Sequence, residues 1–166
     1  MRARSAQVHA TCVKLGAAGK PFRAPPSAGV LILGASGAGK SDLALRLIAA
    51  GATLVADDRT DLFVRRGALW AGTPARIAGL MEVRGVGVLP VPYTDEVQVA
   101  LTVSLARRIE RMPKLEAYLP PCQLGGIKRP CPILRINAED ASAPAKIAAA
   151  VAAFARGGFR DFVKAQ

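Results

Sequence analysis

Short runs of apolar residues, separated by glycine- and proline-rich connections, dominate the pattern of the chain and predict more strands than helices. Such runs lie at 30–33 and 53–56, and each is bounded by turn residues, which is typical of a buried strand. Residues 96–103 alternate apolar with polar or small side chains, the pattern of a strand with one buried face. We also expect strands at 8–15 and 132–136, where further apolar runs occur.

The helical period of 3.6 residues is visible in a few places only. After the first apolar run, Leu43, Leu47 and Ile48 share one face, and Gly51 stands where a helix C-cap would lie. Residues 143–155 are rich in alanine, the residue with the highest helix propensity, and carry an apolar stripe. Together with the strands, these helices predict an α/β fold.

The chain is expected to form a single domain over residues 1–166, since this length can bury a core without disulfide or metal support. Within it, residues 1–28 are expected to form a basic N-terminal strand followed by a connector rich in glycine and proline. The runs 62–64 and 68–70 flank Gly67, which predicts a β-hairpin.

Targeting signals and cysteine chemistry narrow the class of protein. No apolar run approaches the roughly 20 residues of a membrane span, and the segment after Arg2 and Arg4 lacks the apolar core of a secretory signal. Cys12, Cys122 and Cys131 are odd in number and widely spaced, which favours reduced thiols over a disulfide framework or a zinc site. We therefore expect a soluble, cytoplasmic protein.

The strongest chemical signal is a glycine-rich loop between the apolar run at 30–33 and the first helical stretch. It consists of Gly34, Ala35, Ser36, Gly37, Ala38, Gly39, Lys40 and Ser41. The sequence fits the pattern G-x-x-x-x-G-K-[ST], in which glycines let backbone N–H groups surround phosphate oxygens. Lys40 can then reach the β- and γ-phosphates, and the Ser41 hydroxyl can ligate Mg²⁺. The flanking strand and helix disfavour the alternative, a glycine-rich connector without chemistry.

A pair of carboxylates, Asp57 and Asp58, follows the run at 53–56. An acidic residue at the end of an apolar strand, after such a loop, is where a nucleotide enzyme holds Mg²⁺ or a catalytic base. Adjacent side chains on an extended backbone point in opposite directions, so we expect the two aspartates to have different roles. The same residues also suit a turn, but the preceding loop favours a function.

Three other charged or titratable residues have two interpretations each. Glu82 and Arg84 interrupt an apolar, glycine-bearing run at 81–91, and charges there are costly unless they are paired or lie at a site. Glu82 is thus a candidate carboxylate near a metal ion, and Arg84 a candidate partner of a phosphate, but a strand with solvent-facing charges fits equally well. His9 is the only histidine, and the residues alone favour an ordinary structural histidine.

The net charge of +11 is concentrated outside the predicted nucleotide core. Residues 1–28 carry five basic and no acidic side chains, and residues 106–135 carry seven basic and two acidic ones, whereas residues 29–105 balance seven against seven. Clustered Lys and Arg suit nucleic acid, an acidic protein surface or the phosphates of a nucleotide. Nucleic acid is the least favoured of these, because the chain has no nucleic-acid motif and only eight aromatic residues.

Taken together, these motifs resemble the catalytic domain of the HPr kinase/phosphorylase family. The resemblance rests on GASGAGKSDLAL at 34–45, LVADD at 54–58, MEVRGVGV at 81–88 and the segment Val8-His9-Ala10. It implies a nucleotide-binding architecture like that of phosphoenolpyruvate carboxykinase, on a mixed and twisted sheet. It also implies an ATP- and Mg²⁺-dependent kinase for a serine of HPr, a carrier protein of the phosphotransferase system, often with phosphorolysis as the reverse reaction.

The resemblance assigns roles to individual residues. Gly34 to Ser41 would bind the nucleotide, with Lys40 on its phosphates, and Ser41 and Glu82 would hold Mg²⁺. Asp58 resembles the catalytic carboxylate that accepts the proton of the substrate hydroxyl.

Two further assignments come from the same resemblance. His9 would be the neighbour of Asp58 in the site, and Arg111, within Glu110-Arg111-Met112-Pro113, resembles the active arginine of the family.

Several features depart from the longer members of the family. We expect the chain to lack their N-terminal domain. Its connector between His9 and Gly34 is longer, and residues 133–137 stand where an arginine- and proline-rich phosphorolysis segment is expected. Kinase activity is therefore expected more strongly than phosphorolysis. The longer members assemble as hexamers, so a homo-oligomer is one expectation for this chain, but its shorter length leaves the hexameric state open. The competing functions are a P-loop kinase of a small metabolite and a nucleotide-sensing regulator without phosphoryl transfer. A pure sensor would not need the full set of His9, Lys40, Asp58 and Glu82.

Overall fold

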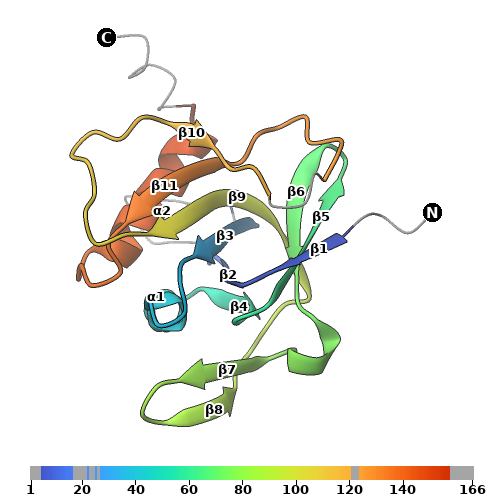
Figure 1. The fold of residues 1–166 in the computed structure, drawn as a ribbon, viewed down its shortest axis with the longest axis vertical. Helices are drawn as coiled ribbons and strands as arrows, with labels where there is room; N and C mark the ends of the chain where they lie inside the picture. The colour runs from blue at the N-terminus through green and yellow to red at the C-terminus, as the bar shows by residue number, and fades with distance from the viewer. Residues whose placement is uncertain (1–4, 17–21, 23–24, 26, 121–123, 158–166) are drawn as a thin grey trace.

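A curled, mixed β-sheet forms the body of the molecule (Figure 1). The computed structural model describes residues 5–16, 22, 25, 27–120 and 124–157. Within these residues the strands of the sheet are β1 (Ser5–Val8), β2 (Ala10–Lys14), β3 (Ala28–Leu33), β4 (Thr53–Ala56), β5 (Thr60–Arg65), β6 (Ala68–Gly72), β9 (Glu96–Leu105), β10 (Glu116–Ala117) and β11 (Pro132–Ile136). Their order is β1-β5-β6-β9-β3-β2-β4, and β11 pairs with both β9 and β10.

The long strand β9 organises this sheet because its two halves have different neighbours. Near its start, residues 96–98 pair antiparallel with β6, while residues 102–105 pair in parallel with β11. Along its other edge β9 pairs in parallel with β3. The carboxyl ends of β3, β9 and β11 therefore meet at one edge of the sheet, where the glycine-rich loop begins.

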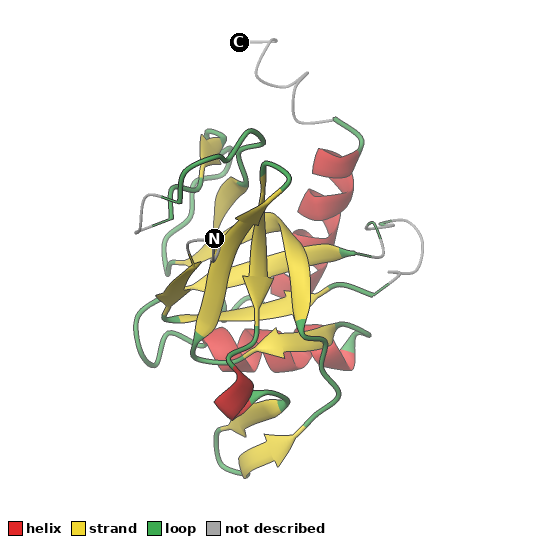
Figure 2. Cartoon of the chain, turned by 90° about the vertical axis from the view of Figure 1, so that its right-hand side faces the viewer, coloured by secondary structure: helices red, strands yellow, loops and turns green. Residues whose placement is uncertain are grey.

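The helices α1 (Lys40–Ala49) and α2 (Ala143–Ala155) pack on one face of the sheet (Figure 2). Side chains from both helices and from β3, such as Leu43, Ile147 and Ile32, are fully buried between them. After α1 the backbone of Gly51 has φ of 102°, and its N–H donates to the carbonyl of Ile48 over 2.9 Å. The predicted C-terminal glycine of the first helix is thus confirmed.

The opposite face of the sheet is covered by the curled strands and by the segment that follows β9. Residues 107–130 are rich in basic side chains, but Tyr118 and Leu124 are buried with Cys131 in a second apolar cluster. The backbone N–H of Tyr118 also donates to the carbonyl of Cys131 over 2.7 Å. The segment is therefore a partly structural cover of the sheet, because its apolar side chains complete the core.

The N-terminal strand differs from the expectation in a way that affects the site. A single strand was expected at 8–15, but the chain bends at His9 and forms two strands. β1 pairs with β5, whereas β2 pairs with β3 and β4. The bend thus marks the point where the chain changes neighbours within the sheet.

A separate hairpin, β7 (Leu80–Val83) and β8 (Gly87–Pro90), projects beyond the main sheet (Figure 1). It is preceded by the 3₁₀ turn η1 (Ala75–Ile77). The run at 81–91 is therefore a hairpin with a turn at 84–86, in which the N–H of Val86 donates to the carbonyl of Val83 over 2.9 Å. No helix in the described part of the chain is long and apolar enough to cross a membrane.

Candidate active site

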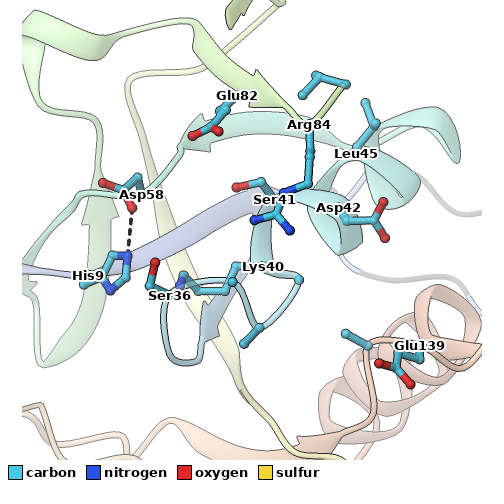
Figure 3. A pocket seen from close by; sticks show the side chains of 15 residues that line it. His9, Ser36, Lys40, Ser41, Asp42, Leu45, Asp58, Glu82, Arg84 and Glu139 are labelled. Atoms are coloured by element: carbon cyan, nitrogen blue, oxygen red, sulfur yellow. Dashed lines mark hydrogen bonds and ion pairs between the residues drawn. The ribbon is translucent and has the colours of Figure 1, made fainter. Parts of the chain in front are cut away.

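A pocket of about 510 Å³ opens at the edge of the sheet where β3 ends (Figure 3). Residues 36–41 of the glycine-rich loop form its floor. His9, Asp58 and Glu82, which the sequence assigns to the same site, also line it. The structure thus brings together residues from the bend after β1, the end of β4 and the β7–β8 hairpin.

The glycine-rich loop adopts a backbone that other residues would not tolerate well. Gly37 and Gly39 have φ of 76° and 94°, in the left-handed region that side chains disfavour. A Cβ atom on Gly34 would lie 3.1 Å from Cβ of Ala38 and 3.2 Å from Cβ of Leu105. The loop can therefore fold tightly against β9 and deliver the N-terminus of α1 to the pocket.

Lys40 is held inside the loop by the backbone. Its Nζ atom donates to the carbonyl oxygens of Gly34 and Ala35, over 2.9 Å and 3.0 Å. Only 6% of the residue is exposed. The ammonium group is therefore fixed at the loop, where it can bind phosphate oxygens in place of these carbonyls.

Asp57 connects the loop to the rest of the site. Its Oδ1 atom accepts hydrogen bonds from the hydroxyls of Ser41 and Thr11, over 2.7 Å and 2.9 Å. Its Oδ2 atom accepts one from the backbone N–H of Glu82 over 3.0 Å. The carboxylate is buried, and these charge-assisted bonds replace the water that it loses. Asp57 thus holds the loop serine and the hairpin in one arrangement.

Asp58 points in another direction, into the pocket, as expected for the neighbour of Asp57. Its Oδ1 atom lies 2.7 Å from Nε2 of His9, and both side chains are well exposed. The backbone of Asp58 has φ of 65°, which aspartate adopts more readily than most residues. A carboxylate paired with an imidazole beside a phosphate-binding loop can accept a proton from an incoming hydroxyl.

The donor set suits a hydrated Mg²⁺ ion better than a metal held by the protein alone. The described residues contain no group of three or more His, Cys, Asp or Glu placed to hold a metal. The hydroxyl of Ser41 nevertheless bonds the Asp57 carboxylate over 2.7 Å, and Ser41 and Glu82 both line the pocket. Magnesium is usually bound by one or two carboxylates, phosphate oxygens and waters, so this arrangement fits it.

Comparison with known proteins identifies the family. A family model described as the HPr Serine kinase C-terminal domain matches residues 24–116. The chain belongs to this family. Its fold resembles a solved structure titled "Structure of the Hpr(Ser) kinase/phosphatase from Coxiella burnetii", with a TM-score of 0.70, 22% identity and coverage of 96% of each chain.

Curated members of the family are similar to part of this chain. It is 52% identical to the HPr kinase/phosphorylase of Lactococcus lactis subsp. lactis (strain IL1403) over 64 residues, which are 38% of this chain and 21% of that protein. It is 48% identical to the enzyme of the same name from Clostridium tetani (strain Massachusetts / E88) over 93 residues, 54% of this chain and 30% of that protein. These matches therefore span a fifth to under a third of the relatives' length.

The structure does not bring every residue assigned by the family resemblance to the pocket. Arg111 is exposed in the segment between β9 and β10 and does not line the pocket. Arg84, at the tip of the β7–β8 hairpin, does line it. The role of Arg111 as an active arginine of this family member stays a prediction.

The pocket also contains residues that sequence reasoning missed. Asp42 and Leu45 lie on α1, and Glu139 lies in the turn after β11. The loop motif ends at Ser41, so it gives no signal for the first two. Glu139 could be found only from the parallel pairing of β9 with β11, which places its turn at the same edge as the loop.

Proposed function

We propose that this HPr kinase-family domain uses ATP and Mg²⁺ to phosphorylate a serine of the carrier protein HPr in the cytoplasm. The observation that carries the proposal is the pair of His9 and Asp58, 2.7 Å apart, at one end of a pocket with a phosphate-binding loop as its floor. A nucleotide sensor needs the loop but not this pair. The names of the curated relatives, which the chain matches in part, support HPr as the substrate.

In the proposed reaction, each residue has a role that follows from its place. The loop and Lys40 bind the phosphates of ATP, and the hydroxyl of Ser41 with the carboxylates of Asp57 and Glu82 would hold Mg²⁺. When bound, the ion neutralises charge on the phosphates. Asp58 accepts the proton of the serine hydroxyl.

The transfer makes one bond to the γ-phosphorus and breaks another. The serine oxygen forms a bond to the γ-phosphorus, the bond between that phosphorus and the β,γ-bridging oxygen breaks, and ADP leaves with the electron pair. His9 keeps the Asp58 carboxylate aimed at the hydroxyl. Phosphorolysis of the phosphoserine would instead use inorganic phosphate as the acceptor, which would form pyrophosphate and return the serine hydroxyl its proton from Asp58.

The test is direct labelling with ATP carrying a labelled γ-phosphate, purified HPr and Mg²⁺. We expect label on HPr with the native chain and none when the acceptor serine of HPr is replaced by Ala. Asp58→Ala should lower kcat for transfer at least about 1,000-fold and leave nucleotide binding within about twofold, since general bases act on the chemical step. Asp61→Asn is the matched control, because Asp61 bonds Gln7 on the sheet and does not line the pocket.

Two results would contradict the proposal. Labelling of a small molecule from a metabolite extract, with HPr unlabelled, would favour a metabolite kinase. Equal transfer by the native chain and Asp58→Ala would exclude the proposed base.

A further inference from the structure

The pocket has two chemically different ends (Figure 3). His9 and Asp58 lie at one end, and Lys40 and Ser41 lie in the middle. The other end is lined by Asp42, Leu45 and Glu139, and the guanidinium of Arg84 lies between this end and Ser41. The proposed reaction assigns no role to these residues.

The proposed reaction fixes which part of a nucleotide reaches this second end. The γ-phosphate must face Asp58, and the phosphates must lie on the loop, so the nucleoside extends away from Asp58. Ionised carboxylates accept hydrogen bonds and repel phosphates. Asp42 and Glu139 therefore suit the hydroxyls of a ribose, and the half-buried side chain of Leu45 suits the face of a base.

Arg46 holds this end of the pocket together from behind. Its Nε atom donates to Oδ2 of Asp42 over 3.1 Å. Its Nη1 atom donates to the carbonyl of Asp140 over 3.2 Å, and its Nη2 atom donates to the carbonyl of Ala138. One guanidinium thus ties α1 to a turn that lies more than ninety residues later.

The same turn is held by side-chain hydrogen bonds and lies close to the glycine-rich loop. The side-chain Oδ1 of Asn137 accepts the backbone N–H of Glu139 over 3.0 Å, and Lys146 Nζ donates to the Asp140 carboxylate over 2.5 Å. A Cβ atom on Gly39 would lie 3.4 Å from Cβ of Ala138, so the turn packs against the loop. Within the described residues the Glu139 carboxylate forms no recorded hydrogen bond or ion pair, and it lines the pocket.

We propose that this end of the pocket is the nucleoside subsite, with Glu139 accepting a ribose hydroxyl and Arg46 acting as the positioning residue that holds its wall. The direction of the nucleotide rests on the proposed function. Arg46 itself lies behind the wall and does not line the pocket, so it acts through the turn that it binds.

The test compares the binding of ligands that differ in the nucleoside alone. Isothermal titration calorimetry of the full chain with Mg²⁺ would measure Kd for ATP, 2′,3′-dideoxy-ATP and inorganic tripolyphosphate. Arg46→Met should raise Kd for ATP about tenfold and leave Kd for tripolyphosphate within twofold. Glu139→Ala should raise Kd for ATP about fivefold and leave dideoxy-ATP unchanged, because the lost bond involves the hydroxyls.

Two further variants distinguish the positioning role of Arg46 from a general loss of folding. Arg46→Lys can reach one of the carbonyls and should restore part of the ATP affinity. Arg156→Met is the matched control, because the Arg156 side chain donates to the carbonyl of Ala152 at the end of α2 and does not line the pocket. It should bind all three ligands like the native chain.

Two results would overturn the proposal: an equal rise in Kd for ATP and tripolyphosphate in Arg46→Met, or an unchanged Kd for ATP in Glu139→Ala. If Arg46→Met does not fold, Glu139→Ala decides alone, since it removes no side-chain bond within the described residues. The binding assay contains no HPr, so it is independent of the labelling assay. If the variants change the affinity for ATP and tripolyphosphate as expected but HPr stays unlabelled, only the proposed function is refuted. If HPr is labelled but the variants affect these ligands equally, only the nucleoside subsite is refuted.

Discussion

Nε2 of His9 lies 2.7 Å from Oδ1 of Asp58, although 49 residues separate them in the chain. His9 stands on the bend between β1 and β2, and Asp58 follows β4. The antiparallel pairing of β2 with β4, in which Cys12 faces Ala56, brings the two residues to the same edge. The pair is thus a product of strand register.

A double substitution tests whether His9 and Asp58 act as one unit. We expect His9→Ala to lower kcat for HPr phosphorylation about 100-fold, the typical contribution of a positioned proton-transfer group. The double variant with Asp58→Ala should be no worse than Asp58→Ala alone, because residues that act together are not additive. Steady-state kinetics with labelled ATP would measure this. Additive losses would show that His9 acts independently.

The adjacent aspartates should differ in how much each stabilises the fold. Asp57→Asn replaces a buried acceptor of hydrogen bonds from Ser41, Thr11 and the Glu82 N–H. We expect a loss of about 2 kcal/mol in the free energy of unfolding, since an amide cannot satisfy all three donors. Asp58→Asn should cost less than about 0.5 kcal/mol, as its side chain is exposed.

Urea unfolding followed by far-UV circular dichroism would measure both variants. Asparagine also tolerates the positive φ of Asp58, so the backbone adds no penalty there. A larger loss of stability in Asp58→Asn than in Asp57→Asn would contradict the division of roles.

Two glycines with similar backbones offer a matched test of the loop. Gly37 and Gly51 have φ of 76° and 102°, and a Cβ on either would meet no atom within 4 Å. Replacing each by Ala should cost about 1–2 kcal/mol of stability, from backbone strain. Only Gly37→Ala should weaken the binding of both ATP and tripolyphosphate, because it distorts the loop. Equal binding losses in both variants would show that the strain acts through global stability.

The buried thiols predict a specific dependence on pH. Burial raises the pKa of Cys131 from 9.0 to about 11, and burial likewise raises the pKa of Cys12. Since the folded pKa values lie above the unfolded ones, the thiols contribute stability below about pH 9 that is lost as the pH rises through 11. Unfolding experiments between pH 8 and 11 would follow this loss.

Labelling with iodoacetamide checks the same thiols independently. In a Cys122→Ser background at pH 8, the folded chain should react at least about 100-fold more slowly than the unfolded chain, because the thiolate is rare and inaccessible. Cys122 lies outside the described residues, so its removal isolates the two buried thiols. Rapid labelling of the folded chain would contradict the burial of both.

Features encoded in neighbouring residues were predictable from the sequence. The strands at 53–56 and 132–136 and the helix at 143–155 are confirmed with the expected bounds, because their apolar periods are local. The glycine-rich loop was equally clear, since its spacing reflects one local backbone geometry. The hairpin around Gly67 is also confirmed, with φ of 75° at that glycine.

Features that depend on strand pairing were not predictable from the residues alone. The pattern at 8–15 favours one continuous strand, and only the pairing of β1 with β5 and of β2 with β3 explains the bend at His9. Glu139 likewise reaches the pocket through the pairing of β11 with β9. The role of Asp57 was also hidden, because its partner Thr11 lies 46 residues away.

The β7–β8 hairpin has a consequence for how the site opens. In the described residues it pairs with no strand of the main sheet, and it is attached through the buried side chain of Met81 and the bond from the Glu82 N–H to Asp57. Its opening free energy is therefore smaller than that of the sheet, and its amide protons should exchange first. A ligand that bridges the loop and Glu82, and binds only the closed hairpin, raises this opening free energy by RT ln(1 + L/Kd), where L is the free ligand concentration. Protection of the hairpin amides therefore reports occupancy of the site.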